Sequence, residues 1–314
     1  CISSAASDVY KRQDMKLPIA STTKLMTAIL ALENCRGDEC VYIRPEYCNV
    51  EGSSMYLAPG ERRTVKELVT GLLLVSGNDA ALALAGHIAG DSARFAALMN
   101  AKAETLGMAD THFVNQHGLN ASGHYSTARD MARLMEYCMD NAAFAELDGM
   151  TSCTVDGKLL VNHNRLLGTC PGCIGGKTGF TEAAGRCLVS CCVRDGARLV
   201  CVTLSAPDDW NDHIALYNWA YSRCAMRSVT GGLSFCVPVI SGERRWVYLV
   251  PEKELALFLP TDAEIVLRAE LPWFEFAPVT AGEAKGRVAA SVNGVQLAEY
   301  DLVYKESVGP AARD

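Results

Sequence analysis

The sequence contains no apolar run of about 18 residues, the length that a helix needs to cross a bilayer. It also begins without the basic segment and apolar stretch of a secretion leader. Its net charge is -7, and its lysines and arginines are scattered instead of forming a basic stripe. We therefore expect no membrane-spanning helix and no nucleic-acid partner. If the protein is exported, we expect this chain to be a mature, trimmed or incomplete form.

The chain is also poor in cysteine for a disulfide scaffold, since 14 of 314 residues fall short of the ~8–10 % typical of one. Cys170 and Cys173 have the spacing of a redox or zinc motif. A zinc site needs a second closely spaced pair, and the downstream cysteines lack that spacing: Cys187, Cys191 and Cys192. We predict no metal and no cofactor. A disulfide such as Cys35 with Cys40 stays open, because pairing cannot be read from sequence.

Helical patterns dominate the first half of the chain. Thr64 and Glu67 form a capping box before an apolar stretch, and Asp91 and Thr127 have the positions of N-caps of two later helices. Three further elements close this part: strands over 188–193 and 198–205, joined by a hairpin turn at Asp195-Gly196, and a helix over 214–221.

After the glycines at 231 and 232 the pattern changes to short alternating strands, which is typical of a β-rich domain. These strands are expected over 245–250, 264–271 and 287–291, the last ending in an Asn293-Gly294 hairpin turn. The chain is long enough for two domains. We expect an α+β fold in three parts: an unassigned segment over 1–14, a mixed domain over 15–228 and a β-sandwich-like domain over 232–305.

Three fragments, in chain order, supply the groups for serine acyl transfer without a histidine base. Ser21 offers a hydroxyl, and Lys24 lies three residues on, so that on a helix the two side chains share a face with Cβ atoms about 5–6 Å apart. Ser76 and Asn78 add a second hydroxyl and an amide. The third fragment, KTG at 177–179, adds a second ammonium beside a hydroxyl.

The sequence around each fragment supports this interpretation. Alone, an SxxK or an SxN pattern occurs about once by chance in a chain of this length, and KTG is rarer by roughly an order of magnitude. Ser21 opens an apolar run, as at a helix start where backbone N–H groups are unpaired. Ser76 interrupts two apolar helical stretches, and KTG follows two glycines and precedes a strand pair. All three contexts favour a shared cleft.

Four stretches carry a resemblance to a known family: 17–24 (LPIASTTK), 115–119 (NQHGL), 125–131 (YSTARDM) and 176–181 (GKTGFT). The chain resembles the low-molecular-mass penicillin-binding proteins of the D-alanyl-D-alanine carboxypeptidase family, from about Met15 to Tyr304. The resemblance implies a penicilloyl-serine transferase fold, like that of β-lactamases. In this fold an antiparallel sheet with a helical subdomain is followed by a small C-terminal β-rich domain.

The resemblance also implies a function. Such an enzyme removes the terminal D-Ala from stem pentapeptides of bacterial peptidoglycan through an acyl-serine intermediate, and β-lactams inhibit it covalently. It works outside the cytoplasm, in the cell envelope or as a secreted protein. Many relatives end in an amphipathic membrane anchor, which this chain does not show. Membrane-surface association through a C-terminal segment not present here is therefore left open.

The chemistry of the groups suggests their roles. Ser21 is the expected nucleophile, and Lys24 is the expected general base in acylation. A free lysine, with a pKa of about 10.4, is protonated at neutral pH and cannot act as a base. Burial and a second nearby cation, here Lys177, would both lower the pKa of Lys24.

The other motif residues are expected to handle the leaving group and the substrate. Ser76 relays a proton to the leaving amine, and Asn78 hydrogen-bonds the substrate amide. Lys177 and Thr178 face the terminal carboxylate, and Gly179 keeps the substrate's path along the strand free of a side chain. The resemblance places the oxyanion hole at two backbone N–H groups, each worth about 3–4 kcal/mol in comparable sites: those of Ser21 and Phe180.

Other polar residues have simpler expected roles. His117 and His124 have no serine or acid at a spacing that would pair with them, so we interpret both as structural. The remaining candidates are interpreted as helix-terminal charges (Arg129, Asp130) and as partners of loop backbone (Asn162, Asn164). Arg186, near the motif strand, is a candidate for holding a carboxylate, but we favour a solvated strand arginine.

Two alternatives stay open. A class A β-lactamase needs a glutamate followed three or four residues later by an asparagine, and no glutamate between the second and third motifs has one. The other is a catalytically impaired protein that only binds peptidoglycan. Relatives are expected to carry a strand pair upstream of Leu17, and the short polar segment over 1–13 does not resemble it, which would expose a sheet edge. The intact nucleophile–base pair favours the enzyme.

Overall fold

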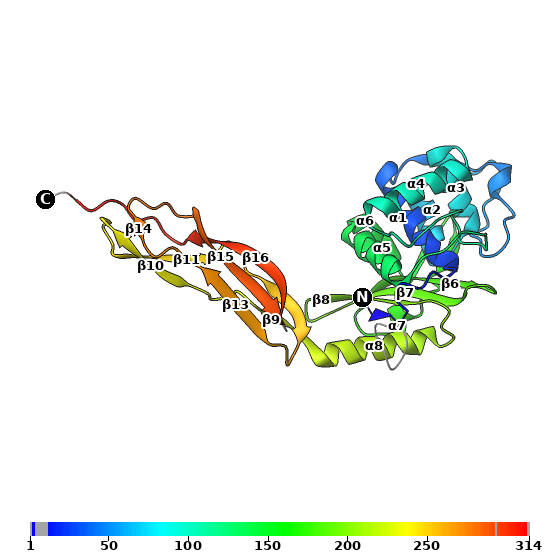
Figure 1. The fold of residues 1–314 in the computed structure, drawn as a ribbon. Coiled ribbons are helices and arrows are strands. Elements are labelled where there is room, and N and C mark those ends of the chain that lie inside the picture. Colours follow the sequence, from blue (N-terminus) through cyan, green and yellow to red (C-terminus); the bar gives the residue numbers. More distant parts are fainter. Residues whose placement is uncertain (1, 4–11, 293, 313–314) are drawn as a thin grey trace. The chain divides into compact units, whose positions relative to one another are not determined.

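A four-stranded sheet forms the middle of the first part of the chain. Its order is β1 (Ile2–Ser3), β8 (Ala197–Thr203), β7 (Gly185–Arg194) and β6 (Cys173–Thr181). Strands β6, β7 and β8 are antiparallel, and β1 runs parallel to β8, so β6 lies at an edge. The computed structural model describes residues 2–3, 12–292 and 294–312. The chain divides into two units, Cys1–Ala220 and Tyr221–Asp314 (Figure 1).

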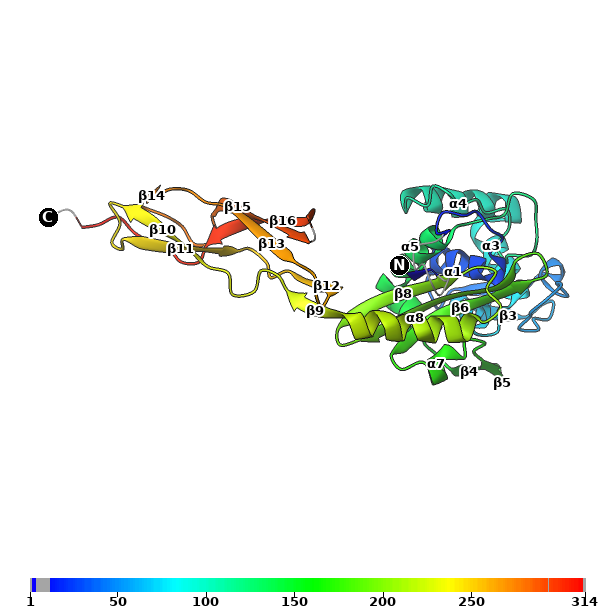
Figure 2. The ribbon, with the colours of Figure 1, turned by 60° about the horizontal axis from the view of Figure 1, so that its bottom comes forward.

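Helices cover both faces of this sheet (Figure 1 and Figure 2). One face carries α1 (Lys24–Asn34), α2 (Val65–Leu74), α3 (Asn78–Ala89), α4 (Ser92–Thr105), α5 (Ala128–Asp140) and α6 (Ala142–Asp148). The other face carries α8 (Asp209–Arg223), where the His213 ring lies 2.7 Å from Ser190 Oγ of β7. No helix in the described part of the chain is long and apolar enough to cross a membrane.

Helix α1 is deeply packed over most of its length. Every residue from Lys24 to Ala31 is buried, because helices α2, α3 and α5 surround it. A helix that is apolar on all sides belongs in the interior of a domain. The polar groups at its start, Ser21 and Lys24, are therefore held on a rigid element.

Local sequence signals set the helix starts. The hydroxyl of Thr64 accepts the Glu67 N–H at 3.2 Å, and the Glu67 carboxylate accepts the Thr64 N–H at 2.7 Å, so the predicted capping box of α2 is confirmed. Asp91 and Thr127 cap α4 and α5 through their side chains, also as predicted.

The strands and helix expected after residue 185 are present, with wider bounds. The turn between β7 and β8 has left-handed backbone at Asp195 (φ 49°) and Gly196 (φ 78°), as a two-residue hairpin requires. The helix predicted over 214–221 begins earlier, at Asp209. Asp209 and Asp212 lie in its first turn, where the helix dipole favours negative charge.

The first unit also contains several short elements. They are η1 (Ala20–Thr23), β2 (Cys40–Tyr42), η2 (Pro45–Tyr47), β3 (Arg62–Thr64), β4 (Ser152–Val155), β5 (Lys158–Val161) and α7 (Leu166–Thr169). Strand β2 pairs with β3, and β4 pairs with β5.

The N-terminal segment contributes one short strand to the sheet. Ile2 and Ser3 pair in parallel with Cys201 and Val202 of β8. The sequence predicted no strand pair at this edge; the described residues form a two-residue strand there. Cys1 and residues 4–11 of the predicted polar segment lie outside the described residues, and so does Asn293 of the expected hairpin turn.

The second unit is built of strands, as the sequence predicted. They are β9 (Cys224–Ser228), β10 (Phe235–Ile240), β11 (Trp246–Pro251), β12 (Ala256–Pro260), β13 (Ile265–Glu270), β14 (Glu275–Phe276), β15 (Ala284–Val292) and β16 (Val295–Tyr304). Six form a sheet in the order β13-β15-β16-β11-β10-β14, and β9 pairs with β12. The expected boundary at residue 228 thus falls inside this unit, after β9.

Candidate active site

Ser21 lies in η1, the short 3₁₀ turn that runs directly into α1. Its hydroxyl oxygen accepts a hydrogen bond from Lys24 Nζ at 2.9 Å, which is the contact that the three-residue spacing predicted. Lys24 is fully buried, whereas Ser21 is half-buried. The turn begins at Ala20 with a left-handed φ of 46°, an uncommon conformation for a residue with a side chain.

The surroundings of Lys24 disfavour its charged form. Its Nζ also donates to the carbonyl of His117 at 2.6 Å. Burial, and next the positive charge of Lys177, lower the pKa of Lys24 well below its ordinary value, while Asp79 acts in the opposite direction. A neutral amine here has a lone pair available to the hydroxyl of Ser21, so that it can accept the hydroxyl proton.

Ser76 lies in the turn between α2 and α3, and Asn78 is the first residue of α3. Ser76 has a left-handed φ of 60°. Its buried Oγ and the buried Oδ1 of Asn78 have no hydrogen-bond partner among the described residues. The other end of the amide is fixed, because Asn78 Nδ2 donates to the carbonyl of Glu51 at 2.6 Å. Buried polar atoms are rarely left unpaired, so both free atoms can serve an incoming ligand.

Asp79, which was not among the residues predicted for the site, supports this turn. Its buried carboxylate accepts hydrogen bonds from Ser54 Oγ at 2.6 Å and from the backbone N–H groups of Met55 and Leu57 at 3.1 and 3.0 Å. These bonds fix the segment next to Ser53, which lines the cleft described below. The sequence signal was its position directly after the SxN motif.

Two buried ionisable groups, Lys177 of the KTG strand and Asp148, interact electrostatically. Burial lowers the pKa of Lys177 to about 8, against the opposing attraction of Asp148. Burial raises the pKa of Asp148 to about 7, although its carboxylate accepts the Gly176 N–H at 2.6 Å. The Lys177 ammonium donates to the carbonyl of Thr178 at 2.9 Å. Asp148 is far away in the sequence, so no motif pointed to it.

Gly179 is required by a close approach between β6 and η1. A Cβ at this position would lie 3.0 Å from the backbone nitrogen of Ser21, and 3.1 Å from the carbonyl oxygen of Ile19 and the nitrogen of Thr22. From the sequence, this glycine is predicted to leave the substrate's path along the strand free of a side chain. The atoms that a Cβ would meet first belong to the turn that carries the serine.

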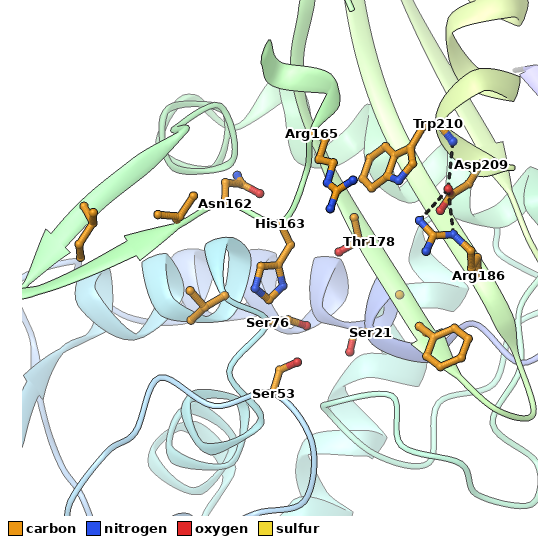
Figure 3. Close-up of a pocket in the computed structure, with 15 residues that line it drawn as sticks. Ser21, Ser53, Ser76, Asn162, His163, Arg165, Thr178, Arg186, Asp209 and Trp210 are labelled. Atoms are coloured by element: carbon orange, nitrogen blue, oxygen red, sulfur yellow. Dashed lines mark hydrogen bonds and ion pairs between the residues drawn. The ribbon is translucent and has the colours of Figure 1, made fainter. Parts of the chain in front are cut away.

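A cleft of about 1050 Å³ lies where these elements meet (Figure 3). The predicted site residues that line it are Ser21, Ser76, Thr178, Gly179 and Phe180. The other three predicted site residues are buried and not part of the lining: Lys24, Asn78 and Lys177. The structure therefore brings the three sequence fragments together at one cleft. Further lining residues include Ser53, Asn162, His163, Arg165, Arg186, Asp209 and Trp210.

Arg186 lies at one end of this cleft, beside Asp209 and Trp210 (Figure 3). Its Nε and Nη2 donate to one carboxylate oxygen of Asp209 at 3.0 and 2.9 Å, and its guanidinium lies 5.8 Å from the centre of the Trp210 ring. Interpreting Arg186 as a solvated strand arginine was therefore wrong. Its partner Asp209 comes from α8, a contact that sequence spacing does not reveal.

The histidines and asparagines singled out from the sequence contact backbone and supporting side chains. His124 accepts the Val114 N–H through Nδ1, so its Nε2 carries the proton that it donates to Thr23 Oγ1 at 2.8 Å. Burial lowers the pKa values of His117 and His124 to about 4. Asn162 donates to the carbonyl of Met150 at 2.9 Å.

The cysteines considered from the sequence are reduced thiols in the structure: Cys35, Cys40, Cys170, Cys173, Cys187, Cys191 and Cys192. The disulfide left open between Cys35 and Cys40 is therefore not formed.

Comparisons with known proteins agree with this geometry. Residues 9–208 match the family described as D-alanyl-D-alanine carboxypeptidase, peptidase S11. The chain is 29 % identical to the D-alanyl-D-alanine carboxypeptidase DacF of Bacillus subtilis, over 96 % of this chain and 82 % of that protein. It is 30 % identical to DacC of Escherichia coli, a protein of the same description, over 94 % of this chain and 79 % of that protein. Among solved structures, penicillin binding protein 5 from Haemophilus influenzae matches with a TM-score of 0.75 and 27 % identity, covering 95 % of this chain and 92 % of that chain.

The fold is that of a penicilloyl-serine transferase followed by a C-terminal β domain, and it defines the class as a serine-type peptidase. The chain belongs to the D-alanyl-D-alanine carboxypeptidase family, peptidase S11, whose members include low-molecular-mass penicillin-binding proteins.

Proposed function

We propose that this protein hydrolyses the terminal D-Ala from peptidoglycan stem pentapeptides through an acyl-serine intermediate, and that β-lactams acylate the same serine. The observation that carries this proposal is the contact of 2.9 Å between Lys24 Nζ and Ser21 Oγ, on a lysine whose pKa is lowered by burial and by Lys177. A binding protein without catalysis needs no such pair.

In acylation, Ser21 Oγ bonds to the carbonyl carbon of the penultimate D-Ala, and its proton passes to the neutral amine of Lys24. The backbone N–H groups of Ser21 and Phe180 are the proposed donors to the developing oxyanion. The close approach of Gly179 to the Ser21 nitrogen, which leaves no room for a Cβ, supports a site assembled from these two segments.

Collapse of the tetrahedral intermediate breaks the C–N bond, and the leaving amine needs a proton. Ser76 is the proposed relay from protonated Lys24, because its buried Oγ has no other partner among the described residues. Asn78 is the proposed partner of the substrate amide through its unpaired Oδ1. Water then attacks the acyl-serine, releases the shortened peptide and restores the Ser21 hydroxyl.

The terminal carboxylate of the substrate is proposed to bind at the β6 side of the cleft. Lys177 supplies positive charge from behind the strand, and the Thr178 side chain lines the cleft. Arg186 adds a guanidinium at the same end, half-exposed and oriented by Asp209. Arginine suits this role, since its planar fork matches a carboxylate.

The function places the protein outside the cytoplasm, where its substrate lies, in the cell envelope or as a secreted protein. Association with the membrane surface stays a prediction. Binding of the protein to anionic vesicles would test it. The β-rich second unit stays a proposed separate domain without an assigned partner.

Release of D-Ala from a diacetylated Lys-D-Ala-D-Ala peptide tests the proposed function. The parent protein should release D-Ala, and Ser21→Ala should not, while both remain folded by circular dichroism. If the parent is folded and releases none, the carboxypeptidase proposal is contradicted. Rapid turnover of benzylpenicillin without D-Ala release would instead favour the β-lactamase alternative.

A further inference from the structure

Three side chains of types that commonly bind metal ions lie close together at the C-terminal ends of α1 and α3. Cys35 follows the last residue of α1, Glu39 lies in the loop after it, and His87 lies in the last turn of α3. One ligand atom from each residue lies within 4.8 Å of the other two. We propose that Cys35, Glu39 and His87 form a binding site for a zinc ion, separate from the cleft.

The donor set suits zinc better than the hard cations. Thiolate sulfur, imidazole nitrogen and carboxylate oxygen are the ligands that zinc takes in proteins, whereas magnesium and calcium take oxygen alone. Tetrahedral zinc with bonds of about 2.0–2.3 Å holds its ligand atoms about 3.3–3.8 Å apart. His87 Nε2 and Glu39 Oε1 are 2.8 Å apart, so these two atoms must separate slightly. The sulfur of Cys35 lies within 4.8 Å of both, so it must approach by about 1 Å at most.

The helix ends provide a second, independent attraction for a cation. The C-terminus of a helix carries partial negative charge from its unpaired carbonyl groups. Cys35 is the C-cap residue of α1, which has 11 residues, and His87 precedes the C-terminus of α3, which has 12. Two such ends therefore meet at one place. The three side chains are half-buried, which leaves one side open for a water molecule as the fourth ligand.

The same helices connect this cluster to the proposed catalytic residues. Helix α1 begins at Lys24, and α3 begins at Asn78, so the lengths of 11 and 12 residues correspond to about 16–18 Å between the two ends. A zinc ion at the far ends cannot touch substrate. Its effect is to fasten α1 to α3 and to the loop between α1 and β2, and thereby to stabilise the framework of the site.

Binding replaces existing contacts. The Cys35 thiol releases its proton to solvent and bonds to zinc as thiolate. His87 Nε2 gives up the proton that it shares with Glu39, so that the ring is neutral with its proton on Nδ1, and the hydrogen bond between the two side chains is replaced by two metal bonds. No oxidant or reductant is involved, since zinc keeps its charge.

The test uses the whole chain, stripped of metal and kept reduced with a phosphine. Calorimetric titration with Zn²⁺ alone should show one tight site per chain. Co²⁺ in its place should produce a thiolate-to-cobalt charge-transfer band. At a hundredfold excess of Zn²⁺ over its Kd, the Tm should rise by roughly 5–10 °C. Penicillin acylation should be unchanged, since the ion lies far from the cleft.

Matched variants distinguish zinc binding at this site from zinc binding by other thiols of the chain. Cys35→Ser and His87→Gln should each abolish the tight site, the charge-transfer band and the Tm shift. Cys40→Ser, which removes an exposed thiol outside the cluster, should keep all three. Equal zinc binding by Cys35→Ser and the parent would overturn the proposal. A Cys35–Cys40 disulfide in protein purified without reductant would overturn it as well.

Discussion

Replacing Gly179 with alanine tests how the cleft is assembled. The new Cβ would lie 3.0 Å from the Ser21 nitrogen and 3.1 Å from both the Ile19 oxygen and the Thr22 nitrogen. Comfortable contacts are about 3.5 Å or longer, so β6 and the η1 turn must separate by roughly 0.5 Å. Because the Ser21 N–H is a proposed oxyanion donor, this displacement acts directly on the geometry of acylation.

The size of the effect follows from the donor that is disturbed. Complete loss of one oxyanion donor lowers the rate by about 10²–10³, or ~2.7–4 kcal/mol. A displaced donor should lose part of this, so Gly179→Ala is expected to slow acylation by benzylpenicillin between ~10- and ~1000-fold. Overpacking should also lower stability by about 1–3 kcal/mol, which corresponds to a Tm loss of roughly 2–12 °C.

The assay is the second-order rate of acylation by a fluorescent penicillin, measured well below the Tm of the variant so that only folded protein reacts. Gly168→Ala is the matched control, because its Cβ would meet no atom within 4 Å and its φ is not left-handed. The control should acylate like the parent. If Gly179→Ala also acylates within about twofold of the parent, the reasoning about the β6–η1 contact is refuted.

Three further predictions follow from the site and its support. Asp79→Asn removes a negative charge that raises the pKa of Lys24, so the acid limb of the acylation rate against pH should move to lower pH; an unmoved limb would contradict Lys24 as the base. Arg186→Gln should raise the KM for the D-Ala-D-Ala peptide by about tenfold while kcat changes less, and Arg186→Lys should recover part of the loss; an unchanged KM removes Arg186 from the carboxylate site. Thr64→Ala should destabilise α2 by about 1 kcal/mol and lower the Tm by roughly 2–4 °C without affecting acylation, measured by thermal unfolding; an unchanged Tm would show that the cap contributes little.

The parts of the site that lie close together in sequence were predictable. Ser21 and Lys24 are held by one helical turn, so their spacing alone determines that they meet. The caps at Thr64, Asp91 and Thr127 are equally local, and each makes the predicted side-chain hydrogen bond.

Contacts between distant segments were not predictable in this way. Asp148 reaches Gly176 from the end of α6, and Asp209 pairs with Arg186 from the start of α8. Neither aspartate belongs to a motif, because its position depends on how helices pack on the sheet. The same holds for Cys35 and His87, whose proximity comes from the packing of α1 beside α3.

The reason for Gly179 also needed the structure. A glycine in a strand signals close approach of some other atom, but the sequence does not say which atom. The neighbour is the backbone of the turn that carries Ser21. Gly179 therefore allows the KTG strand to lie against this turn, in addition to its predicted role of leaving room for the substrate.

Intact-protein mass spectrometry after incubation with benzylpenicillin tests the central claim most directly. The account predicts one covalently bound penicillin per chain on the parent protein and none on Ser21→Ala, because the nucleophile is Ser21, activated by Lys24. An adduct on both proteins would place the reaction at another residue. A folded parent with neither adduct nor drug turnover would contradict the account of an activated serine.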